Sequence, residues 1–102
     1  MQVIKCLSEN IECTLDAAEE NIKKAIKYKD EFPVAAKAFY TQSILLMDSI
    51  KGQHEAVVTL IEAHRKEKGE PPAPMIAIYN YMHERQMNQA AAIKNLQDMY
   101  MK

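Results

Sequence analysis

The 102-residue chain contains no tryptophan, only two glycines and only four prolines. Glycine and proline make most tight turns, so a chain this poor in both has few places to reverse direction. The formal net charge is −1, and no segment carries the excess of lysine and arginine that neutralising nucleic-acid phosphates requires. These shortages predict a few long elements and argue against nucleic acid as a partner.

Long apolar runs are also missing. Nowhere do about eighteen apolar residues follow one another, as a membrane-spanning helix requires, and the opening stretch MQVIKCLSENIECTLD has no apolar run of signal-peptide length. We therefore expect a cytoplasmic protein that does not enter a membrane. Cys6 and Cys13 would lie about 10.5 Å apart along a helix axis, too far for a disulfide between them. We expect reduced thiols, with a reactive thiol or a bridge between chains as the alternative.

The residues that are present follow the helical period. Hydrophobic side chains make up 48% of the chain and recur at steps of three and four, with no convincing strand pattern. In the first segment the stripe consists of Ile4, Leu7, Ile11, Leu15, Ala18, Ile22 and Ala25. We predict a helix over about residues 2–29, or one that starts at about residue 9 with Ser8 as its cap if the first turn is separate. The helix ends at the approach to Pro33, which suits the first turn of the next helix.

The second segment carries a seam of heptad spacing held for four heptads. Its members are Ala36, Tyr40, Ser43, Met47, Ile50, His54, Val57, Ile61 and His64. This seam predicts a helix over residues 33–68, capped by Gly69 in a left-handed conformation and stopped by the prolines that follow.

The third segment predicts a helix over residues 73–101. Its stripe consists of Met75, Tyr79, Met82, Gln86, Gln89, Ile93, Leu96 and Tyr100. Short links between long helices make antiparallel neighbours, so residues 1–102 are predicted to form one all-α domain, an up-down-up bundle of three helices.

Three helices of unequal length leave apolar surface uncovered, and the residues around the second seam are apolar on more than one side. We therefore predict a homo-oligomer, most simply a twofold dimer that completes a ferritin-like or larger helical bundle. The candidate interface residues are Ile44, Leu45, Gly52, Val58 and Met82. Gly52 costs a helix interior about 1 kcal/mol relative to alanine, which indicates either close approach of another backbone, the favoured reading, or a bend.

The histidines can be placed by pairing positions across each hairpin. His54 is then predicted to lie opposite Asn88 or Gln89 and beside Ser8, Ile11 and Glu12, His64 opposite Tyr79, and His83 opposite Thr59. His54 and His64 lie about 15 Å apart along their helix, so one chain cannot place both on one metal ion. The best metal cluster within the chain is Glu12, His54 and Gln89, a weak candidate beside the simpler reading of hydrogen-bonded packing histidines.

The spacing of serine, histidine, glutamate and glycine residues indicates neither a catalytic set nor a phosphate-binding loop. No glycine-flanked serine is present, two glycines cannot build a phosphate-binding loop, and neither His54 nor His83 has a glutamate three residues before it, as a di-iron bundle requires. We expect no enzyme activity and no cofactor.

The stretch LIEAHRKEKGEPPAPMIAIYNYMHERQ, followed by AAAIKNLQDMY, resembles small helical proteins of bacteria and their phages near the ferritin-like, rubrerythrin-like group. The resemblance covers residues 35–101 and implies a four-helix core, made within one chain or by dimerisation, sometimes with iron held by glutamates and ExxH motifs. The ExxH positions are occupied here by Leu46 and Ser49, which are poor iron ligands.

Together these patterns predict a non-catalytic, self-associating interaction or assembly module. The alternative is a ferritin-like protein with a degenerate ligand set that binds iron or another divalent metal. A third hypothesis is a carrier of a small apolar ligand.

Overall fold

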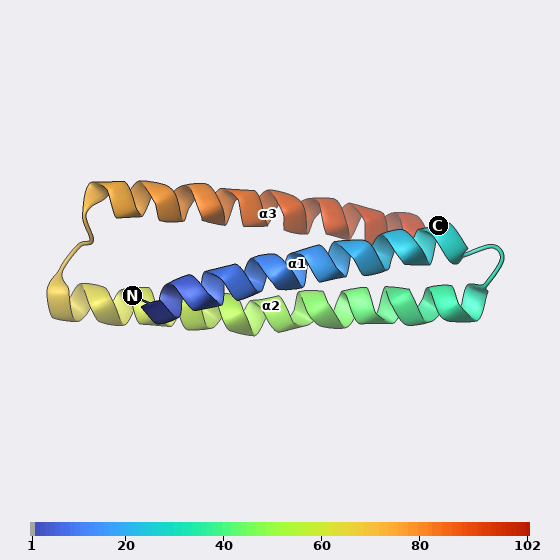
Figure 1. Cartoon of the computed structure of the whole chain (residues 1–102), viewed down its shortest axis with the longest axis horizontal. Coiled ribbons are helices and arrows are strands. Elements are labelled where there is room, and N and C mark those ends of the chain that lie inside the picture. Colours follow the sequence, from blue (N-terminus) through green and yellow to red (C-terminus); the bar gives the residue numbers. More distant parts are fainter. Residues whose placement is uncertain (1) are drawn as a thin grey trace.

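The computed structural model, which describes residues 2–102, contains three long helices joined by two short links (Figure 1). Helix α1 spans Gln2–Tyr28, α2 spans Pro33–Lys68 and α3 spans Ala73–Met101. Consecutive helices are antiparallel, and the rod measures 56 × 19 × 18 Å. The all-α class and the up-down-up order are confirmed. None of the helices in residues 2–102 combines the length and apolar character needed to cross a membrane.

The helix ends follow the local chemistry of the two links. Pro33 occupies the first turn of α2, where its missing N–H leaves no intrahelical bond unmade. At the other end, the Gly69 N–H donates to the Arg65 carbonyl, and Gly69 has a φ of 78°. Its ψ of −167° departs from the left-handed helical value, so the chain leaves α2 extended. Pro72, with φ −56° and ψ 144°, prolongs the extended link, which spans the wide gap between α2 and α3 (Figure 1).

The core runs along the predicted stripe of α1. Leu7 is half-buried, and the other six members, Ile4, Ile11, Leu15, Ala18, Ile22 and Ala25, are buried. On α2 the seam alternates buried and half-buried side chains, with Ala36, Ser43, Ile50 and Val57 the buried ones. Both predicted stripes are confirmed. Fully buried alanines on both helices allow α1 and α2 to pack closely along most of their length.

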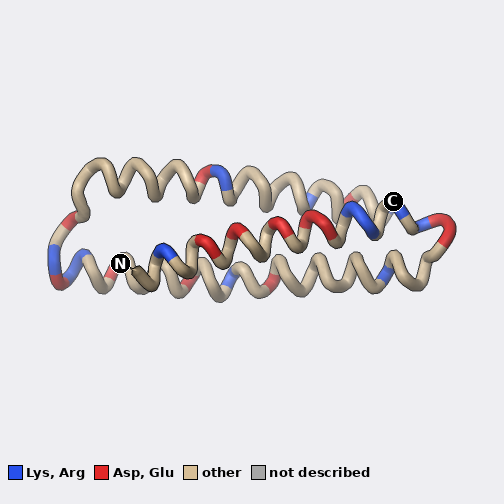
Figure 2. The backbone as a smooth tube through the Cα atoms, in the orientation of Figure 1, with Lys and Arg blue, Asp and Glu red and all other residues tan. Residues whose placement is uncertain are grey.

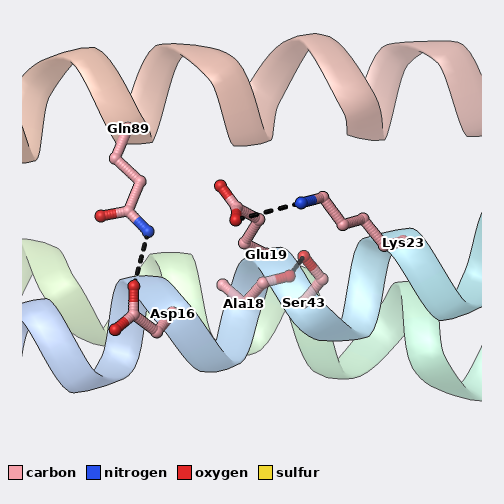
Figure 3. A network of polar contacts seen from close by, with 6 residues as sticks. All are labelled: Asp16, Ala18, Glu19, Lys23, Ser43 and Gln89. Carbon is pink, nitrogen blue, oxygen red and sulfur yellow. Dashed lines mark hydrogen bonds and ion pairs between the residues drawn. The ribbon is translucent and has the colours of Figure 1, made fainter.

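One buried polar network joins all three helices at the same level. The Ser43 hydroxyl of α2 donates to the Ala18 carbonyl of α1 at 2.8 Å, as Figure 3 shows. The same hydroxyl accepts a hydrogen bond from the Gln97 amide of α3 at 3.0 Å. Ser43 is fully buried and Gln97 is 8% exposed, so the network fixes the relative position of the three helices from within the core.

The second half of α3 packs more tightly than the first. The buried residues of α3 are Gln86, Ile93 and Gln97, and near its end the Tyr100 ring stacks on Tyr40 with centroids 4.6 Å apart. Helix α1 has 27 residues against 36 in α2. At the end of the rod where α2 finishes and α3 begins, both helices extend beyond α1, and α3 stands away from the other two (Figure 1).

Charge is distributed as unevenly as packing (Figure 2). Acidic and basic side chains follow one another along α1, whereas α3 carries few. The segment Ala73–Met82, APMIAIYNYM, has no Asp, Glu, Lys or Arg. The part of α3 with the least support from its own chain is therefore also the part with the fewest charges to solvate it.

Candidate functional site

The uncovered apolar surface lies mainly on α3. Of the ten large hydrophobic residues that are exposed within residues 2–102, six belong to this helix: Met75, Ile78, Tyr81, Met87, Met99 and Met101. Ile78 and Tyr81 are 61% and 63% exposed. Scattered exposed apolar residues are normal, so the feature that distinguishes α3 is their concentration on one charge-poor helix.

The predicted interface residues fall into different places. Leu45 and Gly52 are exposed on α2, whereas Ile44 and Val58 are half-buried on the same helix. Met82 is half-buried on α3. Their part in an interface stays a prediction, and the structure adds the exposed side chains Met75, Ile78 and Tyr81 of α3 to the candidates.

An apolar groove opens where α3 stands away from the bundle. Its volume is about 480 Å³, and its walls come from the first two turns of α1, the last turns of α2 and the first turns of α3. The lining residues include Ile4, Ile61, Met75, Ile76, Ile78, Tyr79 and Met82. Lys5 and Arg65 also line it, and Arg65 pairs with Glu70 at 3.4 Å.

His64 contributes a polar atom to this apolar setting. The residue lines the groove together with Tyr79, in keeping with the predicted pairing of these two positions. Its Nδ1 atom is buried and has no hydrogen-bond partner among residues 2–102. A buried polar nitrogen without a partner costs free energy, so His64 is a locally unfavourable feature beside the groove.

A histidine pair links α2 to α3 further along the rod. The Nε2 atoms of His54 and His83 lie 3.1 Å apart, with ring centroids at 5.2 Å and an angle of 32° between the rings. On the other side, Tyr79 stacks on His83 at 6.0 Å and 19°. Both histidines are half-buried, so the pair is accessible to water from one side.

The predicted partners of these histidines were wrong. His54 was expected opposite Asn88 or Gln89, and His83 opposite Thr59, but the two histidines face each other. The hairpin estimate assumes helices packed closely from the link onwards, whereas the extended link and the divergence of α3 shift the pairing here. No sequence spacing could have identified this pair, because it depends on the register between two helices.

The hydrogen bonds of the structure do not join Glu12, His54 and Gln89, the three residues of the candidate metal cluster. Gln89 donates to the Asp16 carboxylate at 2.8 Å (Figure 3), and His54 faces His83 rather than Glu12. Ser8, expected beside His54, instead accepts from the Gln86 amide at 3.2 Å. Within residues 2–102, no group of three or more His, Cys, Asp or Glu side chains is placed to hold a metal ion.

Gly52 has no close neighbour from another helix in the described part of the chain, residues 2–102. A methyl group built on its α-carbon would meet nothing within 4 Å beyond its own helix, so the expected close approach does not come from another helix of the same chain. Approach of a second chain at this position stays a prediction. Cys6 and Cys13 are both exposed free thiols on α1.

Comparison of the chain with models of known protein families, with curated proteins and with solved structures yields no match.

Proposed function

We propose that this protein is a non-catalytic, self-associating helical module, and that two copies pair through the first half of α3 and the apolar groove beside it. The observation that carries the proposal is the charge-free segment Ala73–Met82, in which Met75, Ile78 and Tyr81 are exposed. Burying these side chains stabilises an assembly by about 25 cal/mol per Å² of apolar surface removed from water.

The lengths of the helices support a second copy as the occupant. At this end of the rod α2 and α3 extend past α1, so two helices stand where the rest of the bundle has three. The start of α3 from a second copy supplies an apolar, uncharged helix of the kind the groove lacks. In a twofold arrangement each copy gives this segment and receives the same segment from its partner.

The electrostatics also suit this pairing. Lys5 and Arg65 line the groove, and an occupant without charges brings no like charge near them. The pairing completes a helical bundle larger than three helices at this end, in the manner of the ferritin-like arrangement that the sequence resembles. We also propose the cytoplasm as its compartment, because Cys6 and Cys13 are exposed free thiols and a reducing compartment keeps such thiols reduced.

Sedimentation velocity, or size-exclusion chromatography with light scattering, tests the proposal. The wild-type chain, 11.7 kDa as a monomer, should give twice that mass at micromolar concentration. Ile78→Glu and Tyr81→Glu should each give monomers with unchanged helical circular dichroism. Val34→Glu is the matched control, because Val34 is 86% exposed on α2 at the opposite end of the rod. A wild-type chain that stays monomeric at hundreds of micromolar refutes the proposal.

A further inference from the structure

We propose that His54 and His83 form a binding site for a divalent transition-metal ion of the zinc class, which ties α3 to α2. The site needs residues of one chain only, so it stands independently of the proposed self-association. It also differs from the cluster of Glu12, His54 and Gln89 expected from the sequence, since it shares only His54 with that set.

The distance between the two nitrogens fits a shared ion. Metal–nitrogen bonds of about 2.0–2.1 Å to both Nε2 atoms, 3.1 Å apart, enclose an angle of about 98° at the metal. This value lies between the right angle of neighbouring ligands in a square-planar site and the tetrahedral angle. An ion can therefore bind both histidines with little movement of either helix.

The surroundings hold the rings in place and leave the other coordination positions open. Tyr79 stacks on the face of His83, which restricts rotation of the imidazole. Both histidines are half-buried, so water can supply the remaining ligands. Two imidazoles without a convergent carboxylate favour zinc, copper(II), nickel or cobalt over magnesium or calcium, which prefer oxygen ligands.

Binding requires a proton to move but no redox step. Without metal, a hydrogen bond across the 3.1 Å between the two Nε2 atoms needs a proton on one of them. The metal needs a lone pair on both Nε2 atoms, so the donor ring takes up the tautomer protonated at Nδ1, exchanging the proton through solvent. The shared hydrogen bond is replaced by two metal–nitrogen bonds, and neutral imidazole is the form that coordinates.

The bridge acts where α3 is least supported. Gln86 is the first buried residue of α3. His83 therefore lies between the buried part of the helix and the segment Ala73–Met82, which stands away from the bundle. An ion held between His54 and His83 fixes this point against α2. At a hundredfold excess of free ion over its dissociation constant, binding should raise the melting temperature by roughly 10–20 °C.

The test is titration of the untagged, EDTA-treated full chain with zinc chloride near neutral pH, followed by isothermal calorimetry. Cys6→Ser and Cys13→Ser are included in every variant, because the exposed thiols would bind zinc themselves. The expected result is one equivalent per chain, with affinity reduced at least tenfold in His54→Gln and in His83→Gln. His64→Gln is the matched control and should bind as the parent does, since His64 belongs to the groove.

A second measurement keeps the test decisive if a variant is poorly folded. Long-range ¹⁵N–¹H NMR on the parent should show the Nε2 resonances of His54 and His83 moving together on zinc addition, while those of His64 stay in place. The monomeric variant Ile78→Glu should bind zinc with unchanged stoichiometry, which separates this site from the dimer. No binding, binding that survives both histidine substitutions in folded protein, or one ion per two chains overturns the proposal.

Discussion

Removal of the Ser43 hydroxyl should destabilise the bundle by more than its size suggests. Ser43 donates to the Ala18 carbonyl and accepts from the Gln97 amide, and both side chains are buried. In Ser43→Ala the Gln97 amide keeps no partner in a buried site, which costs about 1–3 kcal/mol. Alanine recovers up to about 0.5 kcal/mol through its higher helix propensity. The expected net loss in the free energy of unfolding is about 1–2 kcal/mol.

Removal of the other partner, the Gln97 amide, should destabilise the fold less. In Gln97→Leu the Ser43 hydroxyl still donates to Ala18, so only its acceptor site is left free, and the loss should be at most about 1 kcal/mol. The double variant removes both partners of the hydrogen bond, and no buried amide remains unpaired. Its loss should therefore fall short of the sum of the two single losses by about 1 kcal/mol.

Urea unfolding followed by circular dichroism measures these differences. The protein concentration is kept fixed, because self-association would itself stabilise the folded chain. Ser49→Ala is the matched control on the same helix, since Ser49 is exposed and its hydroxyl bonds only the Leu46 carbonyl of its own turn. Losses that add within about 0.3 kcal/mol, or a Ser43→Ala change no larger than that of Ser49→Ala, would refute the reasoning.

Three further predictions concern the backbone. Gly52→Ala should stabilise the folded chain by about 0.5–1 kcal/mol in urea unfolding, because Gly52 lies in a helix interior with open space around its α-carbon. Sedimentation of the same variant tests the predicted approach of a second chain at Gly52: weaker self-association supports it, and unchanged self-association contradicts it. Gly69→Ala should destabilise the fold by about 1 kcal/mol, because Gly69 has positive φ. Hydrogen exchange should be faster in Ala73–Met82 than in the rest of α3, where the buried residues lie; uniform protection of α3 in a monomeric variant would contradict the observed divergence.

The sequence was sufficient for the features that depend on local geometry. The seam from Ala36 to His64 follows from the period of a helix, and its buried members are those expected. The ends of α2 follow from the fixed φ of Pro33 and the freedom of Gly69. These signals are carried by each segment alone and need no knowledge of its neighbours.

The features that depend on the distance between helices could not be predicted from the pattern of a single segment. The meeting of His54 with His83 requires the path of an extended link and the divergence of α3. Gln97 lies off the predicted stripe of α3 yet is buried, because the Ser43 hydroxyl gives its amide a partner inside the core. Helical period identifies apolar faces, but a buried amide is accepted only where another helix happens to satisfy it.

The position of the histidine pair couples the two proposals in a direction that can be measured. An ion between His54 and His83 holds α3 at the point where the charge-free segment Ala73–Met82 begins to stand free. Fixing this point removes conformational freedom that dimerisation would otherwise have to remove, so zinc should tighten self-association. By linkage, dimerisation should tighten zinc binding by the same factor.

Sedimentation equilibrium with and without zinc measures the dimer dissociation constant in the thiol-free parent, with His83→Gln as the control. The constant should fall with zinc in the parent and stay unchanged in the control. If zinc instead raised the dimer dissociation constant in the parent but not in His83→Gln, the metal-bound position of α3 would close the groove to a second copy. The same sign must appear when zinc affinity is compared between the parent and the monomeric Ile78→Glu variant, because a coupling free energy between two binding events is reciprocal.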